Sequence, residues 1–229
     1  MYKDHPDINT PEISLEIWRY MELWKFLDII DNKRLFLSQV SQFEDKLDGR
    51  IPSSKIREAS LDHPLVKIDN FAERILKKSH YINCWSSEDD ETYPLWKIYS
   101  DYRNSVAIKT TIGDLIKSFS EEESEQYIGK IKYINPADTY FFHGNTNQFF
   151  FEKRKYFSFE NEVRIMTIRR YNGYKELLEL PIGTFVKINP DQLIKEVKLA
   201  PFATESFKKL IELKLTEVNI NVEVKYSEI

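Results

Sequence analysis

Hydrophobic and polar residues alternate along several short stretches of the chain, a pattern typical of strands with one buried face. These stretches predict strands over residues 15–23, 35–37, 81–87, 105–109, 127–134, 159–166, 184–188, 196–200 and 219–225. Apolar residues at helical spacing predict helices over residues 24–30, 53–78 (interrupted at 62–64), 89–102, 110–119, 145–157, 190–195 and 204–215. Because helices and strands interleave irregularly, the sequence predicts an α+β fold. Residues 1–14 are expected to be a polar lead-in, and residues 15–229 a single domain.

The stretch from residue 159 to residue 166 is the most charged of the alternating segments. Its apolar residues are expected on one face of the strand and its charged residues, Glu160, Glu162 and Arg164, on the other. Lys153 and Arg154 lie just upstream. A solvated strand face explains this pattern, and so does a concave surface that binds an anionic ligand through charge-assisted hydrogen bonds.

The composition excludes several classes of protein. The chain has 229 residues, 41% of them hydrophobic and 31% charged, which is typical of a globular protein and not of a disordered one. The net charge of −4 provides no overall basic surface for nucleic acid, although a local patch is compatible with it. A single cysteine, no apolar run of about 20 residues and no signal-peptide pattern predict a cytoplasmic protein without a membrane partner. The oligomeric state stays open.

The spacing of the glycine, histidine and cysteine residues argues against several kinds of binding site. The six glycines are too far apart to build a G-x-G-x-x-G fingerprint or a P-loop. The four histidines are dispersed, and Cys84 is alone, so no metal site of the zinc kind is expected. Cys84 lies in the middle of a predicted strand and is expected to be a buried, inert thiol.

Three aromatic residues near the predicted strand 81–87 allow two interpretations. Trp85, Trp96 and Tyr99 are either core residues or a platform on which a base or a nicotinamide ring stacks.

Two constellations of residues suggest catalysis. The first combines Arg19, Ser86 and the pair Glu160 and Glu162. Cleavage of an N-glycosidic bond develops positive charge on the sugar, which a carboxylate stabilises, and an arginine fork matches the oxygens of a pyrophosphate. A hydroxyl group such as that of Ser86 would orient the carboxylate.

The second constellation combines loop acids, Glu44, Asp45 or Asp48, with Glu162-x-Arg164, and resembles the D…E-x-K arrangement of metal-dependent nucleases. In that hypothesis Asp45, Glu160 and Glu162 would hold Mg²⁺. Arginine stays protonated, so Arg164 could stabilise charge but could not act as a base. A third hypothesis is a non-catalytic module that binds nucleotide or nucleic acid phosphates through Lys153, Arg154 and Arg164.

A series of motifs along the chain resembles the bacterial domain-of-unknown-function family 2971. The motifs are Trp18-Arg19-Tyr20, Phe43-Glu44-Asp45 with Asp48-Gly49, Cys84-Trp85-Ser86 with Trp96 and Tyr99, Val106-Ala107-Ile108-Lys109, Lys153-Arg154, Phe159-x-Glu-x-Glu-x-Arg164 and Tyr226-Ser227. The match runs in order over residues 15–229. The family's usual proline after the loop aspartate is Lys46 here.

The order of Arg19, Ser86 and Glu162 is also similar to the ADP-ribosyltransferase superfamily, with Glu160 as the upstream glutamate of the E-x-E motif. This resemblance implies a mixed, largely antiparallel split sheet with peripheral helices, and NAD⁺ as a substrate, without a metal. Arg19 would hold phosphate or ribose, Ser86 the nicotinamide end, and Glu162 the ribosyl cation. A nucleic acid or a protein would accept the ADP-ribose, in a toxin or in phage defence. Further candidates for binding substrate or cofactor are Tyr20, Trp85, Trp96, Tyr99, Lys153, Arg154 and Arg164.

Overall fold

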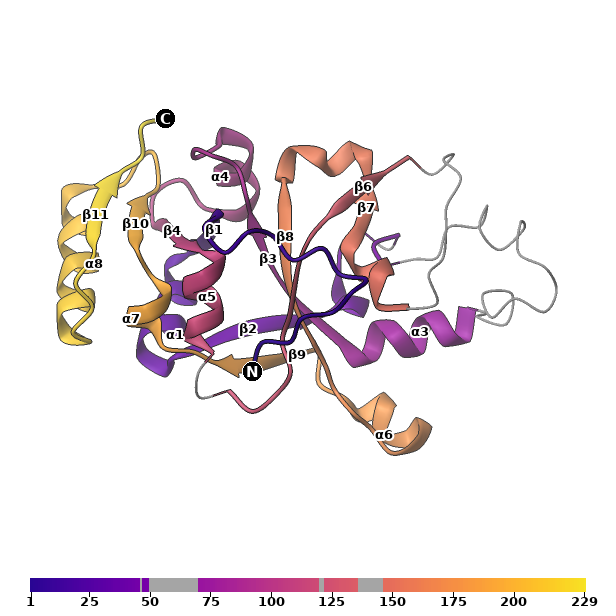
Figure 1. The fold of residues 1–229 in the computed structure, drawn as a ribbon. Coiled ribbons are helices and arrows are strands. Elements are labelled where there is room, and N and C mark those ends of the chain that lie inside the picture. The colour runs from indigo at the N-terminus through magenta and orange to yellow at the C-terminus, as the bar shows by residue number, and fades with distance from the viewer. Residues whose placement is uncertain (46, 50–69, 120–121, 136–145) are drawn as a thin grey trace.

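The structure is a computed structural model that describes residues 1–45, 47–49, 70–119, 122–135 and 146–229. Within these residues the chain forms one nine-stranded sheet with helices around it, and a separate pair of strands (Figure 1). The strands of the large sheet are β1 (Glu16–Glu22), β2 (Arg34–Gln39), β3 (His80–Ser86), β4 (Ser105–Thr111), β5 (Tyr127–Lys130), β8 (Glu162–Ile168), β9 (Gly183–Lys187), β10 (Glu196–Leu199) and β11 (Glu223–Tyr226). The separate pair is β6 (Lys132–Ile134) and β7 (Glu152–Arg154).

The sheet is mixed and mostly antiparallel, as predicted. Its strands follow the order β11-β10-β4-β1-β3-β2-β9, and β8 pairs with β3 and β5. In the large sheet the pair β10 and β11 is parallel, and so is the separate pair β6 and β7. The predicted α+β class, with a split sheet and peripheral helices, is therefore confirmed.

The split lies along one edge of β3. That edge pairs with β2 near its start, through Tyr81 and Ile82, and with β1 at its end, where Trp18 lies opposite Ser86. In the described registers neither β1 nor β2 pairs with residues 83–85. The other edge of β3 pairs with β8 along its whole length. The strands β1 and β2 therefore diverge at the middle of β3 and leave a gap in the sheet.

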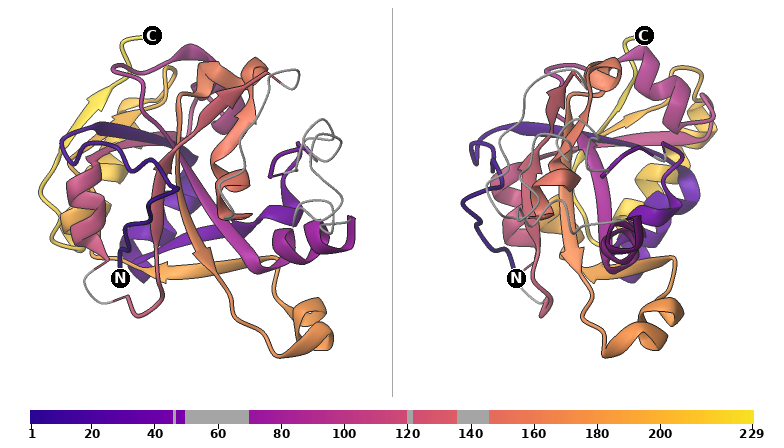
Figure 2. Two further views of the ribbon diagram at one scale, coloured as in Figure 1. Left: turned by 45° about the vertical axis from the view of Figure 1, so that its right-hand side comes forward. Right: turned by 90° about the vertical axis from the view of Figure 1, so that its right-hand side faces the viewer.

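Helices cover the sheet and its ends. They are α1 (Leu23–Asn32), α3 (Asn70–Ser79), α4 (Tyr93–Tyr99), α5 (Ile112–Ser118), α6 (Gly173–Glu179), α7 (Pro190–Leu193) and α8 (Glu205–Glu217), with the 3₁₀ turns η1 (Val40–Gln42), η3 (Thr146–Phe151) and η4 (Lys155–Glu160). Figure 1 shows α8 beside β10 and β11 at one end of the molecule and α3 at the other. In both views of Figure 2, α6 projects away from the sheet. Within the described residues no helix is long and apolar enough to cross a membrane.

Local sequence explains several helix starts. The side-chain oxygens of Thr111, Asn189 and Thr204 accept hydrogen bonds from the first turns of α5, α7 and α8, as expected for N-cap residues. The helix predicted from residue 89 begins only after Thr92, because Pro94 suits the first turn of a helix. The acids before it lie outside the helix, and one of them, Glu91, points into the protein.

Four other predicted elements differ from the structure. The strand predicted over residues 219–225 begins only at Glu223, after Asn219, which adopts a left-handed conformation with φ of 58°. The helix predicted over residues 145–157 is instead η3, β7 and the start of η4, where Phe149, Phe150 and Phe151 are all buried. The strand predicted from Phe159 begins at Glu162, because Asn161 adopts a left-handed conformation with φ of 40°. The single strand predicted over residues 127–134 is interrupted at Ile131, whose N–H donates to the carbonyl oxygen of Glu162.

Most of the helix predicted over residues 53–78 lies outside the described residues.

The two faces of the sheet carry separate cores. The larger one holds Ile17 and Met21 of β1 together with Trp85 of β3 and Val163 and Ile165 of β8. Smaller clusters lie on the other face, one around Phe150 and Met166 and another around Trp18 and Trp96. The alternation predicted for β1 and β8 is confirmed by this division.

The buried carboxylate of Glu91 binds the C-terminal residues through hydrogen bonds. Glu91 accepts hydrogen bonds from Trp96 Nε1 at 2.8 Å, Lys198 Nζ at 3.0 Å, Ser227 Oγ at 2.7 Å and the backbone N–H of Glu228 at 2.7 Å. The side chains of Glu91 and Lys198 are 4% and 9% exposed. The C-terminal residues are thereby tied to the segment that leads into α4.

Replacing Glu91 by alanine is expected to reduce the free energy of unfolding by about 3 kcal/mol, because it leaves the buried Lys198 ammonium without its closest partner. Urea denaturation measures this loss. The matched control is Glu217→Ala, which removes an exposed ion pair with Lys214 and should change the stability little. Equal losses of stability in the two variants would contradict the stabilising role of Glu91 beside the buried Lys198.

Candidate functional site

The gap between β1 and β2 forms a cavity of about 270 Å³. Side chains from β1, β2, β3, α1, α4, the residue after η1, the end of η4 and the start of β8 line it: Trp18, Arg19, Tyr20, Lys25, Phe36, Ser38, Phe43, Ile82, Asn83, Cys84, Trp85, Ser86, Leu95, Tyr99, Glu160 and Glu162. The predicted site residues Arg19, Ser86, Glu160 and Glu162 are therefore brought together around one cavity.

This convergence depends on the split in the sheet. Arg19 lies on the same face of β1 as Ile17 and Met21, whereas Ser86 and Glu162 are register partners on the opposite face. In a continuous sheet, side chains on opposite faces would not reach the same space. Because residues 83–85 have no strand beside them on this edge, both faces border the cavity.

Arg19 is a cation without a charged partner. Its Nη1 is buried and makes no hydrogen bond, and no carboxylate in the described part of the chain forms an ion pair with it. Its guanidinium carbon lies 5.9 Å from the centre of the Trp85 ring. Burial lowers the pKa of Arg19 to about 10, so the group still carries its charge at neutral pH. A partly buried cation without a charged partner makes this side of the cavity attractive to an anion.

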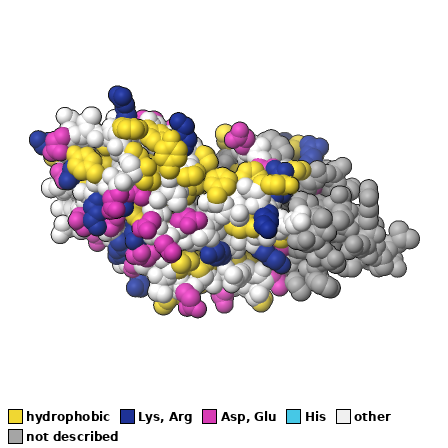
Figure 3. Space-filling view, turned by 90° about the horizontal axis from the view of Figure 1, so that it is seen from above, with side chains coloured by type: hydrophobic (Ala, Val, Ile, Leu, Met, Phe, Trp, Pro, Cys, Tyr) yellow, Lys and Arg dark blue, Asp and Glu magenta, His cyan; other side chains and the backbone are white. Residues whose placement is uncertain are grey.

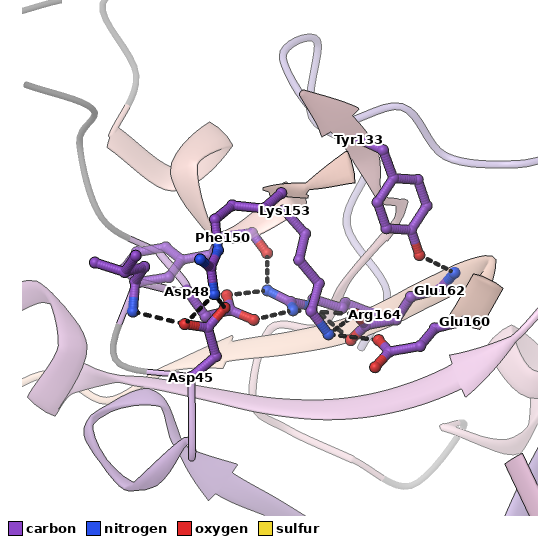
Figure 4. A network of polar contacts seen from close by, with 10 residues as sticks. Asp45, Asp48, Tyr133, Phe150, Lys153, Glu160, Glu162 and Arg164 are labelled. Atoms are coloured by element: carbon purple, nitrogen blue, oxygen red, sulfur yellow. Dashed lines mark hydrogen bonds and ion pairs between the residues drawn. The ribbon is translucent and has the colours of Figure 1, made fainter. Parts of the chain in front are cut away.

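Glu162 is held ionised by two cations. Arg164 donates to it at 2.7 Å from Nε and at 3.1 Å from Nη2, and Lys153 Nζ lies 3.1 Å from Oε2 (Figure 4). Burial alone would raise its pKa, but the charge and hydrogen bonds of Arg164, helped by Lys153, lower the pKa to about 2. The backbone N–H of Glu162 donates to the Tyr133 hydroxyl at 2.8 Å. The carboxylate is thus charged and fixed at the edge of the cavity.

Glu160 lies in a different electrostatic environment. Its carboxylate bonds to the ammonium of Lys153, which reaches between the two glutamates in Figure 4. Burial raises the pKa of Glu160 and outweighs the effect of Lys153. Two neighbouring carboxylates with pKa values shifted in opposite directions are suited to different roles, one as a permanent charge and the other as a group that exchanges a proton.

Arg164 organises the network and has no donor left for a ligand. Besides its bonds to Glu162, Nη1 donates to Asp48 at 2.8 Å and to the Phe150 carbonyl at 2.8 Å, and Nη2 donates to Asp48 at 2.6 Å. All five N–H groups of the guanidinium are therefore used. Burial lowers its pKa, but Asp48 and Glu162 outweigh burial and raise it. The candidate role of Arg164 in binding substrate or phosphate does not fit this geometry, because the side chain is buried and saturated.

A neighbouring cavity of about 690 Å³ shares five lining residues with the first: Phe43, Cys84, Tyr99, Glu160 and Glu162. Arg154 borders it and pairs with both oxygens of Asp45 at 3.1 Å. Lys153, Arg154 and Arg164 do lie together here, as the binding-module hypothesis requires. Each of them is already bound to a carboxylate.

The aromatic candidates divide into core and cavity residues. Trp96 is fully buried, donates to Glu91 and packs edge-on against Tyr20 at 4.9 Å, so it offers no face to a ligand, contrary to the prediction that it binds one. Tyr20 borders the first cavity, and its hydroxyl accepts a hydrogen bond from the N–H of Thr92. Trp85 and Tyr99 line the cavity, with Tyr99 43% exposed.

Cys84 borders both cavities at the middle of β3. Burial raises the pKa of its thiol well above the usual value, which keeps the sulfur protonated and agrees with the predicted inert role.

The carboxylates of the nuclease hypothesis do not form an open oxygen cluster. Asp45 is paired with Arg154, while Glu160 and Glu162 share Lys153. Among the described residues, no group of three or more His, Cys, Asp and Glu side chains is arranged to hold a metal ion.

Two residues of the network were not assigned their roles from the sequence. In the sequence, Asp48 is one of several loop acids and part of the Asp48-Gly49 motif, and Tyr133 lies within a predicted strand. Asp48 contacts Arg164 across 116 positions of sequence, so no local pattern signals the pair. The tyrosine reaches Glu162 only because β6 lies beside the start of β8, which depends on the interruption of the strand at Ile131.

No family model matches the sequence, so the resemblance to the domain-of-unknown-function family 2971 is not confirmed, and no curated protein matches it either. Among solved structures, the chain is similar to Thermus sp. 2.9 DarT in complex with NAD⁺, with a TM-score of 0.41 and 11% identity over 96% of this chain and 98% of that one. It is also similar to Thermus sp. 2.9 DarT in complex with ADP-ribosylated ssDNA, with a TM-score of 0.41 and 10% identity over the same shares.

Replacing Asp48 by asparagine is expected to lower the free energy of unfolding by about 3 kcal/mol, because the buried Arg164 loses one of its two carboxylates. Denaturation in guanidinium chloride measures the change. Asp28→Asn is the matched control, since it weakens a partly exposed pair with Arg34 and should cost much less. Equal stability of the two variants would show that the bond between Asp48 and Arg164 does not stabilise the fold.

The low pKa of Glu162 also predicts a dependence of stability on pH. The folded pKa of about 2 lies below the unfolded value of about 4.3. Glu162 therefore stabilises the fold above pH ~4.3, and this contribution is lost as the pH falls toward 2. Unfolding measured between pH 6 and pH 2.5 should show a shallower loss in Glu162→Gln than in the natural chain. Parallel curves would argue against an ionised Glu162 in the folded state.

Proposed function

We propose that the protein transfers ADP-ribose from NAD⁺ to a macromolecule. The observation that carries this proposal is the convergence of Arg19, Ser86 and Glu162 on one cavity, with Arg19 lacking a partner and Glu162 held ionised. These are the groups that transfer at a ribose C1′ needs: a cation for phosphate, a hydroxyl, and a carboxylate beside the developing positive charge.

In this reaction the bond between the ribose C1′ and the nicotinamide nitrogen breaks, and the nicotinamide leaves with the electron pair. The Glu162 carboxylate stabilises the ribosyl cation. The bonds from Arg164 and Lys153 hold this carboxylate ionised and in place at the edge of the cavity. The nucleophilic atom of the acceptor then bonds to C1′ and releases its proton. Glu160, whose pKa is raised, is placed to position the acceptor and receive that proton.

A nucleic acid or a protein could serve as acceptor, and the surface beside the larger cavity favours a single-stranded nucleic acid. Ile98, Tyr99 and Phe159 border that cavity and are each more than two-fifths exposed. Figure 3, which views the side where α4 lies in Figure 1, shows hydrophobic side chains gathered there with basic ones among them. Exposed aromatic rings beside cations are suited to stacking unpaired bases. A role as a toxin or in phage defence fits this activity and stays a prediction.

The two alternatives receive less support from the geometry. A Mg²⁺-dependent nuclease would have to displace Lys153 and Arg154 from the carboxylates of Asp45, Glu160 and Glu162. A non-catalytic phosphate-binding module would have to free cations that already have partners. Activity in the presence of EDTA, or its survival in Asp45→Ala, would count against the nuclease.

The first test measures NAD⁺ binding by calorimetry and thermal shift, with transfer to single-stranded DNA as the activity. Arg19→Ala should abolish stabilisation by NAD⁺, because it removes the free cation of the cavity. Glu162→Gln should bind NAD⁺ but transfer ADP-ribose at least about 10²-fold more slowly, as expected for the loss of a main electrostatic group.

Glu179→Gln is the control, since it makes the same chemical change at an exposed position of α6. Circular dichroism of each variant shows whether it is folded. Turnover by folded Glu162→Gln at the rate of the natural chain would end the proposal.

A further inference from the structure

A second cavity, of about 480 Å³, adjoins the first on the side of α1. Arg19, Lys25 and Phe36 line both cavities, so they form the boundary between them. The remaining wall of this α1 cavity consists of Trp24, Leu27, Asp28, Ile29, Asp31, Asn32, Arg34 and Phe185. The boundary is therefore cationic, and the chamber beyond it combines apolar and aromatic side chains with the polar groups of Asp28, Asp31, Asn32 and Arg34.

Two cations, Arg19 and Lys25, line this boundary and could bind the same ligand. Arg19 has a buried Nη1 without a hydrogen-bond partner. Lys25 pairs with Glu22 at 2.9 Å, but both side chains are more than two-fifths exposed, and such surface pairs are weak. A diphosphate at this boundary would give Arg19 the anion that it lacks and could attract the Lys25 ammonium from Glu22.

The chamber presents flat side chains to a ligand. Trp24 is 64% exposed and Phe185 is 45% exposed, although both are large and apolar. The Arg34 guanidinium lies 3.7 Å from the centre of the Phe185 ring and is held there by bonds to Asp28. Exposed aromatic rings and an oriented guanidinium plane are the surfaces on which nucleobases stack.

We propose that the α1 cavity holds the adenosine half of the dinucleotide, with the diphosphate on Arg19 and Lys25 and the nicotinamide half in the cavity beside Glu162. This assignment rests on NAD⁺ being the donor. The first cavity alone is smaller than the roughly 300–1,000 Å³ of typical small-molecule sites, whereas the two joined cavities fall within that range.

The opposite placement, with adenosine in the larger cavity beyond Glu162, fits the charges less well. The cations there, Lys153, Arg154 and Arg164, are bound to Asp45, Asp48, Glu160 and Glu162. A diphosphate would have to break those pairs and would lie close to the carboxylates. The donor therefore enters from the side of Arg19, and the larger cavity is left to the acceptor.

The test is calorimetric titration of the full chain with AMP, ADP-ribose and NAD⁺. Trp24→Ala should weaken binding of all three about tenfold, because one stacking surface is lost. Lys25→Ala should weaken binding of ADP-ribose, because the diphosphate loses one of its two cations. Phe159→Ala, which alters only the larger cavity, should leave AMP binding unchanged.

Three outcomes overturn the placement: no binding of any adenine nucleotide, full affinity in Trp24→Ala, or loss of AMP binding in Phe159→Ala. Failure of the proposed function gives a different result. If AMP and ADP-ribose bind with this pattern but no ADP-ribose is transferred, the adenosine site stands and the transferase does not. Transfer that is insensitive to Trp24→Ala leaves the transferase and removes the adenosine site.

Discussion

The structure depends on the way β1 and β2 share one edge of β3. Each strand pairs with a different end of that edge, and the backbone between them is left without a strand beside it. Side chains from both faces of the sheet can therefore border one cavity, Arg19 from one face and Glu162 from the other. The Asn83 side chain donates to the Phe36 carbonyl at 2.7 Å across the gap, which satisfies part of the polar backbone that the missing strand leaves.

A buried charge network fixes the carboxylate side of this cavity. Arg164 has two carboxylates and a carbonyl around it, and Lys153 has two glutamates. Taking such charges out of water is costly, and the cost is offset only when nearly every donor is bonded. In return the network holds Glu162 ionised at a defined place while Glu160 keeps a raised pKa. On the opposite side of the cavity, Arg19 has no charged partner among the described residues, and an anion bound there would supply one.

The cavities on either side of this network differ in the charge that they offer. On the side of α1, cations lie at the boundary of an apolar and aromatic chamber. On the side of η4, the cations are paired, and exposed aromatic residues border a wider opening. A donor and an acceptor that approach from opposite sides would meet at Glu160 and Glu162, which line both the first and the larger cavity.

Local patterns along the chain are enough to predict the class of fold and the faces of its strands. Alternation in β1 and β8 places Ile17, Met21, Val163 and Ile165 in one core, because side chains alternate along any strand. The caps that Thr111, Asn189 and Thr204 form at the starts of α5, α7 and α8 are likewise local interactions. Only the tertiary structure decided that Asn161 ends η4 before the strand, that Trp96 is buried, and that Arg164 is saturated by Asp48. These outcomes depend on contacts between residues far apart in the chain, and above all on the register that separates β1 from β2, which no local pattern encodes.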